Sequence, residues 1–245
     1  GAVKKATQCK NCFRWTTDHT LRSCPYPKAK VLEPKPLAVD QRLSLGDVLC
    51  FFDTETDSTN AYVAQAIDIN LQFAKVGGTL ESPLLEVMSD MEYDSLIKPK
   101  TPISEASVEW HSDKGGYTNE KLKNASNLRT VAAEAAAKVL AASNAAGHRA
   151  GERRVFMMGM NSNLYDMRLM QFGTIRITGD TWHGLLKDAG VCGVIDLMTL
   201  MKKPVITGMP TLVAAKINGK SNQGKIYKAL FGEDLPDAHV AKSDV

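Results

Sequence analysis

The chain has 245 residues, 44% of them hydrophobic, and a net charge of +3. No apolar stretch approaches the length of a membrane span and no secretory signal is visible, which disfavours membrane and secreted proteins. Beyond the N-terminal region the length suits one domain with a full core. Cys50 and Cys192 sit in apolar runs, where reduced core thiols are the simplest interpretation. We therefore expect an intracellular protein, in cytoplasm or nucleus.

The N-terminus carries a cluster of metal-ligand types. Three of the five cysteines lie there with one histidine, spaced C-x2-C-x6-H-x4-C: Cys9, Cys12, His19 and Cys24. Three thiolates and an imidazole can complete the tetrahedral shell of one structural zinc ion. The spacing resembles a zinc knuckle, although six residues rather than four precede the histidine. Chance clustering of free thiols, or a disulfide pair, is the alternative.

The same region is basic. Residues 1–35 hold eight Lys or Arg against two acids, a net charge of +6, which leaves −3 for the rest of the chain. Aromatic rings among these cations suit unpaired bases and phosphates, although a solvated tail whose rings pack around zinc is the alternative. Four prolines between positions 25 and 36 then predict an extended linker. We divide the chain into a zinc-knuckle-like segment (1–26), a Pro-rich linker (27–44) and one α/β domain (45–245).

The first strand of that domain ends in two acids. Val48 to Phe52 is continuously apolar, as expected for a buried central strand, and Asp53 and Glu55 follow. Because side chains alternate along a strand, both acids leave the same face. Carboxylates this close repel unless a cation lies between them, and hard oxygen ligands suit magnesium or manganese. Alone, the pattern is weak, and a strand that runs into a polar turn at Asp57-Ser58 is then the favoured interpretation.

A second acid opens a helix. Val155 to Met158 reads as another buried strand, and Leu164, Met167 and Leu169 then fall near one face of a helix that Gly173 ends. Asp166 lies in the first turn of this helix, where its charge gains from the helix dipole. The other elements are expected as strands near 62–75, 89–98 and 191–196 and helices near 127–146, 181–188 and 222–231. The histidines His111, His148 and His183 are expected to be structural or exposed.

The end of the chain supplies a proton acceptor. Pro236 and Asp237 signal the start of terminal helical turns, which contain His239 and Asp244. On a continuous helix a spacing of five residues puts these side chains about 140° apart, so His239 should lie on the loop or first irregular turn. Positive potential at a helix N-terminus favours the neutral imidazole that a general base needs. A surface histidine is the alternative.

Together the three acidic motifs, at residues 53–55, 161–166 and 239–244, read D-x-E, N-x-x-x-[FY]-D and H-x(4)-D. Asn161, Tyr165 and Asp166 fill the middle pattern. The three motifs resemble the DEDDh branch of the DnaQ-like 3′→5′ exonucleases, in that family's order and spacing. Residues 222–245 are most similar to the three-prime repair exonucleases, and the resemblance covers residues 44–245. The chain departs from the family at Asp57-Ser58, where Thr-Gly is common.

The resemblance implies a ribonuclease-H-like α/β fold, a mixed sheet flanked by helices, with the small zinc-binding segment before it. It implies two magnesium or manganese ions and His239 as the general base. The implied metal ligands are Asp53, Glu55, Asp166 and Asp244. The residues implied to lie near the terminal nucleotide are Thr54, Thr56, Asn161 and Tyr165.

We therefore predict a 3′→5′ exonuclease that releases nucleoside 5′-monophosphates from DNA, with single-stranded DNA or 3′ ends as its partner and no membrane partner. An exoribonuclease, or a non-catalytic zinc-containing nucleic-acid-binding protein on a nuclease fold, is the alternative. Pairing of two copies is left open. Asp244 is followed only by Val245, so we expect the natural chain to run on and the terminal helix to be cut short. Gly1-Ala2 is expected to be a tag scar.

Overall fold

The structure is a computed structural model that describes residues 43–61, 64–79, 81–174, 181–201 and 223–236, and the backbone alone of 7–8, 15–16 and 175–178. Within these ranges no helix is both long and apolar enough to cross a membrane. Two short N-terminal strands, β1 (Thr7–Gln8) and β2 (Trp15–Thr16), pair antiparallel. The four zinc-ligand candidates, Cys9, Cys12, His19 and Cys24, lie outside the described residues, so the zinc site stays a prediction.

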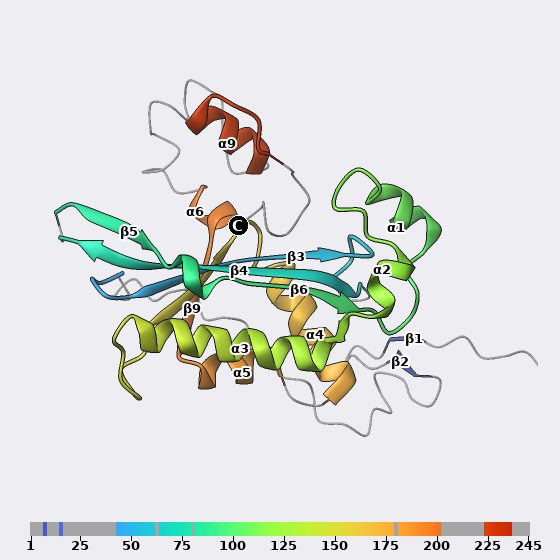
Figure 1. The fold of residues 1–245 in the computed structure, drawn as a ribbon, viewed down its shortest axis with the longest axis horizontal. Helices are drawn as coiled ribbons and strands as arrows, with labels where there is room; N and C mark the ends of the chain where they lie inside the picture. Colours follow the sequence, from blue (N-terminus) through green and yellow to red (C-terminus); the bar gives the residue numbers. More distant parts are fainter. Residues whose placement is uncertain are drawn as a thin grey trace, which may run out of the picture.

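In the rest of the chain three strands come first, and helices and strands then follow in mixed order (Figure 1). The strands are β3 (Val48–Thr56), β4 (Ala66–Gly78), β5 (Pro83–Val87), β6 (Tyr93–Lys98), β7 (Ser126–Asn127), β8 (Val155–Gly159) and β9 (Val191–Asp196). The helices are η1 (Ser89–Met91), α1 (Glu105–Trp110), α2 (Asn119–Lys123), α3 (Leu128–Ala145), α4 (Asp166–Thr178), α5 (Trp182–Asp188), α6 (Leu197–Leu200) and α9 (Gln223–Phe231).

β3 lies inside a seven-stranded mixed sheet with the order β7-β6-β4-β3-β8-β9, and β5 pairs with β4. β4 runs antiparallel to β3, β5 and β6, whereas β8 is parallel to β3 and β9 is parallel to β8. The long β4 therefore pairs with β6 over its first half and with β5 over its second. This arrangement is the mixed α/β sheet that the sequence predicts.

Helices α3, α4 and α5 cover one face of the sheet (Figure 1). The main core lies between them and the sheet, where the ring of Phe52 on β3 lies 6.2 Å from that of Trp182 on α5. Both side chains are fully buried, and burial of a large apolar side chain contributes about 1.5–3 kcal/mol. A smaller cluster on the opposite face is built around Leu49, Phe156 and Ile195.

Four expectations from the sequence are wrong. Helix α4 does not end at Gly173 but continues to Thr178. A Cβ at Gly173 would lie 2.5 Å from Cδ2 of Leu128, so the glycine serves close packing of α3 against α4 and not the end of the helix. Leu164 precedes the helix and is 55% exposed, and Cys192 is exposed rather than a core residue. The strand expected near 89–98 begins only at Tyr93, after the turn of η1.

Candidate active site

The carboxylates of Asp53 and Glu55 project from the last part of β3. Cys50 and Phe52 on this strand pack into the main core under the helices, whereas Phe51 packs against the small cluster on the other face. Because side chains alternate along a strand, Asp53 and Glu55 lie on the side of Phe51, away from α3, α4 and α5. Both are half-buried.

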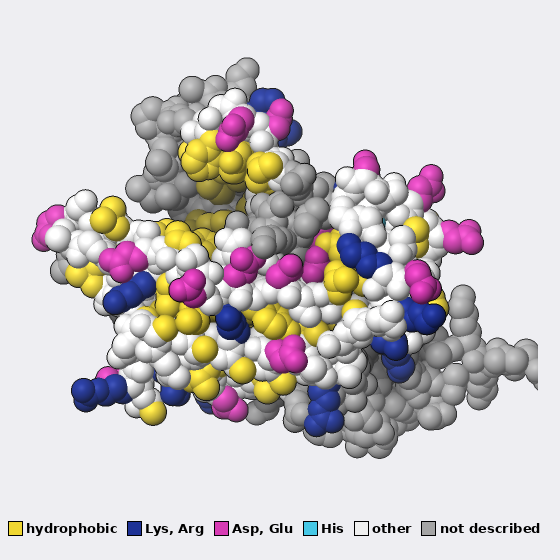
Figure 2. Space-filling view, viewed as in Figure 1, with side chains coloured by type: hydrophobic (Ala, Val, Ile, Leu, Met, Phe, Trp, Pro, Cys, Tyr) yellow, Lys and Arg dark blue, Asp and Glu magenta, His cyan; other side chains and the backbone are white. Residues whose placement is uncertain are grey.

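Neighbouring strands extend this acidic surface. In the antiparallel register Glu55 lies opposite Asp68 and Asp53 lies opposite Asn70, while Asn70 also lies opposite Asp94 on β6. Directly opposite residues point to the same face of a sheet. We call the face formed by these five side chains the acidic face. Acidic side chains can be followed across the middle of Figure 2, above α3.

Asp68 is an acid that the sequence interpretation missed. It is 5% exposed, and its carboxylate accepts hydrogen bonds from the hydroxyl of Tyr117 and the backbone N–H of Ile69. Burial raises its pKa to about 6; the Tyr117 hydrogen bond opposes this rise and the charge of Asp94 adds to it. A buried carboxyl next to Glu55 makes the acidic face costly to ionise fully without a cation.

Asp166 of the second acidic motif contacts Thr54, which lies within the first motif. Asp166, the first residue of α4, is buried, and its Oδ1 accepts a 2.5 Å hydrogen bond from the hydroxyl of Thr54. Burial raises the pKa of Asp166 to about 7, the Thr54 hydrogen bond opposes this, and the charge of Asp196 adds to it. The turn before α4 contains Asn161 at a φ of +60°, whose carbonyl accepts from the backbone N–H of Tyr165. Asn161 therefore shapes the turn that positions Asp166 at the start of α4.

Asp196 is a second acid that the sequence interpretation missed. It is 5% exposed and stands between β9 and α6, where its Oδ1 caps α6 through the N–H of Thr199. Its Oδ2 accepts from the backbone N–H of Asn163, within the turn that precedes Asp166. An aspartate directly after an apolar strand and three residues before a threonine is a helix-cap signal that could have identified it.

The hydroxyls near the end of β3 bind protein groups. Tyr165 donates to the carbonyl of Ser58 and shares a 2.8 Å hydrogen bond with Oγ1 of Thr56. The carboxylate of Asp57 accepts from the backbone and side-chain nitrogens of Gln65 at 2.7 and 2.9 Å. Asp57 thus closes the turn that leads into β4. The nucleotide-contact roles of Thr54, Thr56, Asn161 and Tyr165 stay predictions.

The described histidines lie in structural positions, or their ring nitrogens have no hydrogen-bond partner. His111 is 1% exposed, and its Nε2 lies 2.9 Å from the carbonyl of Thr56, while its ring packs edge-on against Tyr117. His183 lies on α5, and burial lowers its pKa to about 4. The general-base candidate His239 and the fourth carboxylate Asp244 lie outside the described residues. Within the described ranges, no three His, Cys, Asp or Glu side chains form a group that could hold a metal ion.

The residues present nevertheless suit a hard divalent cation. Asp53 and Glu55 supply carboxylate oxygens on one face, which is the donor chemistry that magnesium and manganese prefer. Asn70 on the same face is fully buried and its Oδ1 has no hydrogen-bond partner. Such an unsatisfied acceptor costs about 1–3 kcal/mol, which a bound cation or water would recover.

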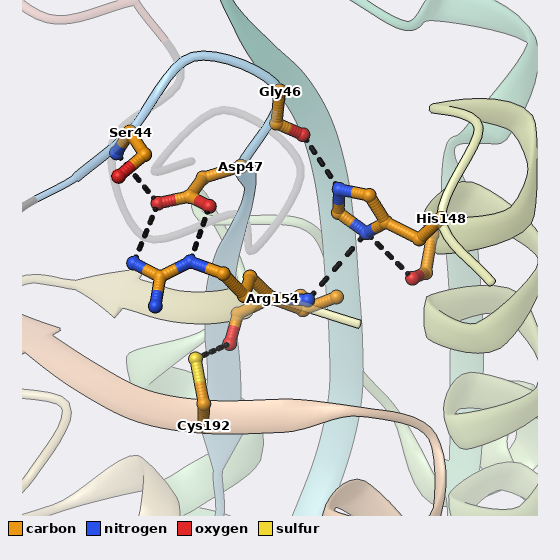
Figure 3. A network of polar contacts seen from close by, with 8 residues as sticks. Ser44, Gly46, Asp47, His148, Arg154 and Cys192 are labelled. Atoms are coloured by element: carbon orange, nitrogen blue, oxygen red, sulfur yellow. Dashed lines mark hydrogen bonds and ion pairs between the residues drawn. The ribbon is translucent and has the colours of Figure 1, made fainter. Parts of the chain in front are cut away.

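The opposite end of the sheet carries a polar network with paired groups (Figure 3). Asp47, 2% exposed, accepts from Nε and Nη2 of Arg154 at 2.7 and 3.0 Å and from the N–H of Ser44 at 2.7 Å. His148 lies with Nε2 2.7 Å from the carbonyl of Gly46 and Nδ1 3.0 Å from the hydroxyl of Ser143. This network ties α3 and β8 to the start of β3. The network is structural, and its carboxylate Asp47 can be compared with the carboxylates of the candidate active site.

Solved structures of exonuclease I have a similar fold. E. coli exonuclease I in complex with a dT13 oligonucleotide matches with a TM-score of 0.54 and 15% identity over 81% of this chain. The zinc-bound E. coli exonuclease I complex with single-stranded DNA and another exonuclease I structure match with a TM-score of 0.54 and 13% identity. This chain has the exonuclease I fold.

The exonuclease I likeness shows the predicted ribonuclease-H-like architecture, a mixed sheet flanked by helices. The matched part corresponds to 38% of the length of the exonuclease I chain, so this chain spans well under half of that protein. No protein-family model matches the sequence. No curated protein matches it either.

Proposed function

We propose that this protein is a metal-dependent 3′→5′ exonuclease that releases nucleoside 5′-monophosphates from DNA. The observation that carries the proposal is the hydrogen bond from Thr54 to Asp166, two residues 112 positions apart. It joins the D-x-E strand to the helix of the second acidic motif within an exonuclease I fold. Only tertiary folding brings these motifs together, at the end of β3 from which Asp53 and Glu55 project.

In this proposal the chain's own residues prepare the site. The carboxylates that hold two magnesium or manganese ions are Asp53, Glu55, Asp166 and Asp244. The bound cations would lower the pKa of a water molecule and stabilise the charge that develops on the phosphate. His239 accepts the proton of the attacking water. Thr54 fixes the rotamer of Asp166, so this ligand is held before substrate arrives.

The substrate we propose is single-stranded DNA or a DNA 3′ end. E. coli exonuclease I, whose fold this chain shares, has been solved with dT13 and dA16 oligonucleotides. We further propose that Cys9, Cys12, His19 and Cys24 bind one structural zinc ion, and that the basic N-terminal segment contacts the nucleic acid. Zinc analysis of Cys9→Ser tests the first point, because undiminished zinc content would remove it.

Labelled oligonucleotides test the proposed activity. Single-stranded DNA, duplex DNA and RNA labelled at either end are incubated with magnesium or with EDTA. We expect stepwise shortening from the 3′ end, abolished by EDTA, and a loss of about 100-fold or more in His239→Ala. Asp53→Asn and Asp166→Asn should be similarly impaired. Asp47→Asn is the matched control for Asp166→Asn, because Asp47 is a similarly buried carboxylate at the far end of the sheet.

The same assay separates the alternatives. Faster degradation of RNA than of DNA would identify an exoribonuclease, because recognition would then involve the 2′-hydroxyl. Oligonucleotide binding with no degradation under any metal condition would identify a non-catalytic binding protein. Cleavage that persists in EDTA, or mainly internal cleavage, would contradict the proposed mechanism.

A further inference from the structure

Asn70 has a buried acceptor without a donor. Its side chain is fully buried on β4 and Oδ1 has no hydrogen-bond partner, although most buried polar atoms in proteins are satisfied. The amide nitrogen lies 3.5 Å from Oε1 of Glu92. This contact favours the present amide orientation, because the flipped amide would place oxygen against oxygen. Oδ1 is therefore the atom left to bind something else.

The position of Asn70 selects the kind of ligand. It is the middle residue of a row across three strands, with Asp53 on one side and Asp94 on the other. Directly opposite residues have Cβ atoms about 5 Å apart. An amide oxygen between two carboxylate-bearing positions lies in negative potential, which attracts a cation and repels an anion. The contact with Glu92 adds further negative charge nearby.

We propose that Asn70 supplies Oδ1 as an additional oxygen ligand to a divalent cation held at Asp53. The inference rests on the proposed function for the cation site, but it adds a residue from a neighbouring strand that the acidic motifs do not contain. Amide oxygens are hard ligands that suit magnesium and manganese. A neutral ligand adds a contact to the acidic face without adding another charge to it.

Manganese binding without nucleic acid tests this role independently of activity. Isothermal titration calorimetry of the full chain with MnCl2 compares the parent with Asn70→Leu and Asn70→Asp. We expect Asn70→Leu to weaken manganese binding by about tenfold or more, and Asn70→Asp to strengthen it. Gln171→Leu is the control, because Gln171 is another fully buried amide with an unpartnered atom, but it lies on α4 under the opposite face. It should leave manganese affinity within about twofold of the parent.

An ordered water on Oδ1 is the competing explanation. It predicts that a folded Asn70→Leu protein, checked by circular dichroism, binds manganese as the parent does, and that result would overturn the role of Asn70. If Asn70→Leu does not fold, an unchanged affinity in Asn70→Asp overturns it instead. Asp53→Asn separates the two proposals: if it abolishes binding while both Asn70 variants bind normally, only the Asn70 inference fails. If Asp53→Asn binds normally, the proposed cation site itself fails.

Discussion

Replacing Asp68 by asparagine should remove a pH-dependent loss of stability. Burial raises the pKa of Asp68 from 3.8 to about 6, against the opposing Tyr117 hydrogen bond. A carboxyl whose pKa rises on folding stabilises the fold fully below about pH 4, and this contribution is lost as the pH rises through about 6. Two pH units at about 1.4 kcal/mol each correspond to about 3 kcal/mol, and the residue is 5% exposed, so solvent screens little of it.

Urea unfolding in EDTA measures this effect. Asparagine cannot ionise, yet its side-chain oxygen can still accept the hydrogen bond that the Tyr117 hydroxyl donates to Asp68. The free energy of unfolding of Asp68→Asn minus that of the parent should therefore increase by about 3 kcal/mol between about pH 4 and about pH 7.5. Asp94→Asn is the accompanying variant, because it removes a charge that raises the pKa of Asp68 and should shrink the effect. A difference that does not change with pH would refute the reasoning.

Three further variants test the contacts around Asp166. Thr54→Val should lower the free energy of unfolding by about 1.5–3 kcal/mol, because it removes a hydrogen bond to a carboxylate. If its effect in urea denaturation simply adds to that of Asp166→Asn, the two side chains do not interact and the prediction is wrong. Tyr165→Phe should raise KM for an oligonucleotide more than it lowers kcat, since it loosens the turn at Ser58; an unchanged KM would contradict this. Asp196→Asn removes a charge that raises the pKa of Asp166, so that pKa should fall in an NMR titration; an unchanged value would show that the charge is screened.

Local sequence signals were sufficient for the elements with continuous apolar runs. β9 spans Val191–Asp196, as the sequence predicts, and the Ala-rich helix is α3, Leu128–Ala145. The end of α4 was not predictable in this way. Gly173 is a helix-ending signal in isolation, but contact with Leu128 of α3 makes it a close-packing position. Tertiary packing overrides local preference there.

The residues of the candidate site likewise divide into those that local motifs predict and those that only the fold reveals. Asp53, Glu55 and Asp166 belong to motifs and could be chosen from the sequence. Asn70 could not, because its importance depends on lying opposite Asp53, and strand register is a long-range property. Asp68 is a buried acid whose partner Tyr117 lies far away in the sequence, whereas Asp196 could have been chosen from its local helix-cap signal.

The hairpin that precedes β6 also escaped prediction. Every residue of β5, Pro83–Val87, is exposed, so the strand lacks the alternation of buried and exposed residues that marks a strand in a sequence. Its pairing with β4 depends on backbone hydrogen bonds rather than on a buried face.

Analysis of the first product from a 3′-labelled single-stranded oligonucleotide with magnesium tests the central claim most directly. We predict a nucleoside 5′-monophosphate carrying the label, released before any internal fragment and absent when EDTA replaces magnesium. A nucleoside 3′-monophosphate, an internal fragment as the first product, or equal release in EDTA would contradict the account.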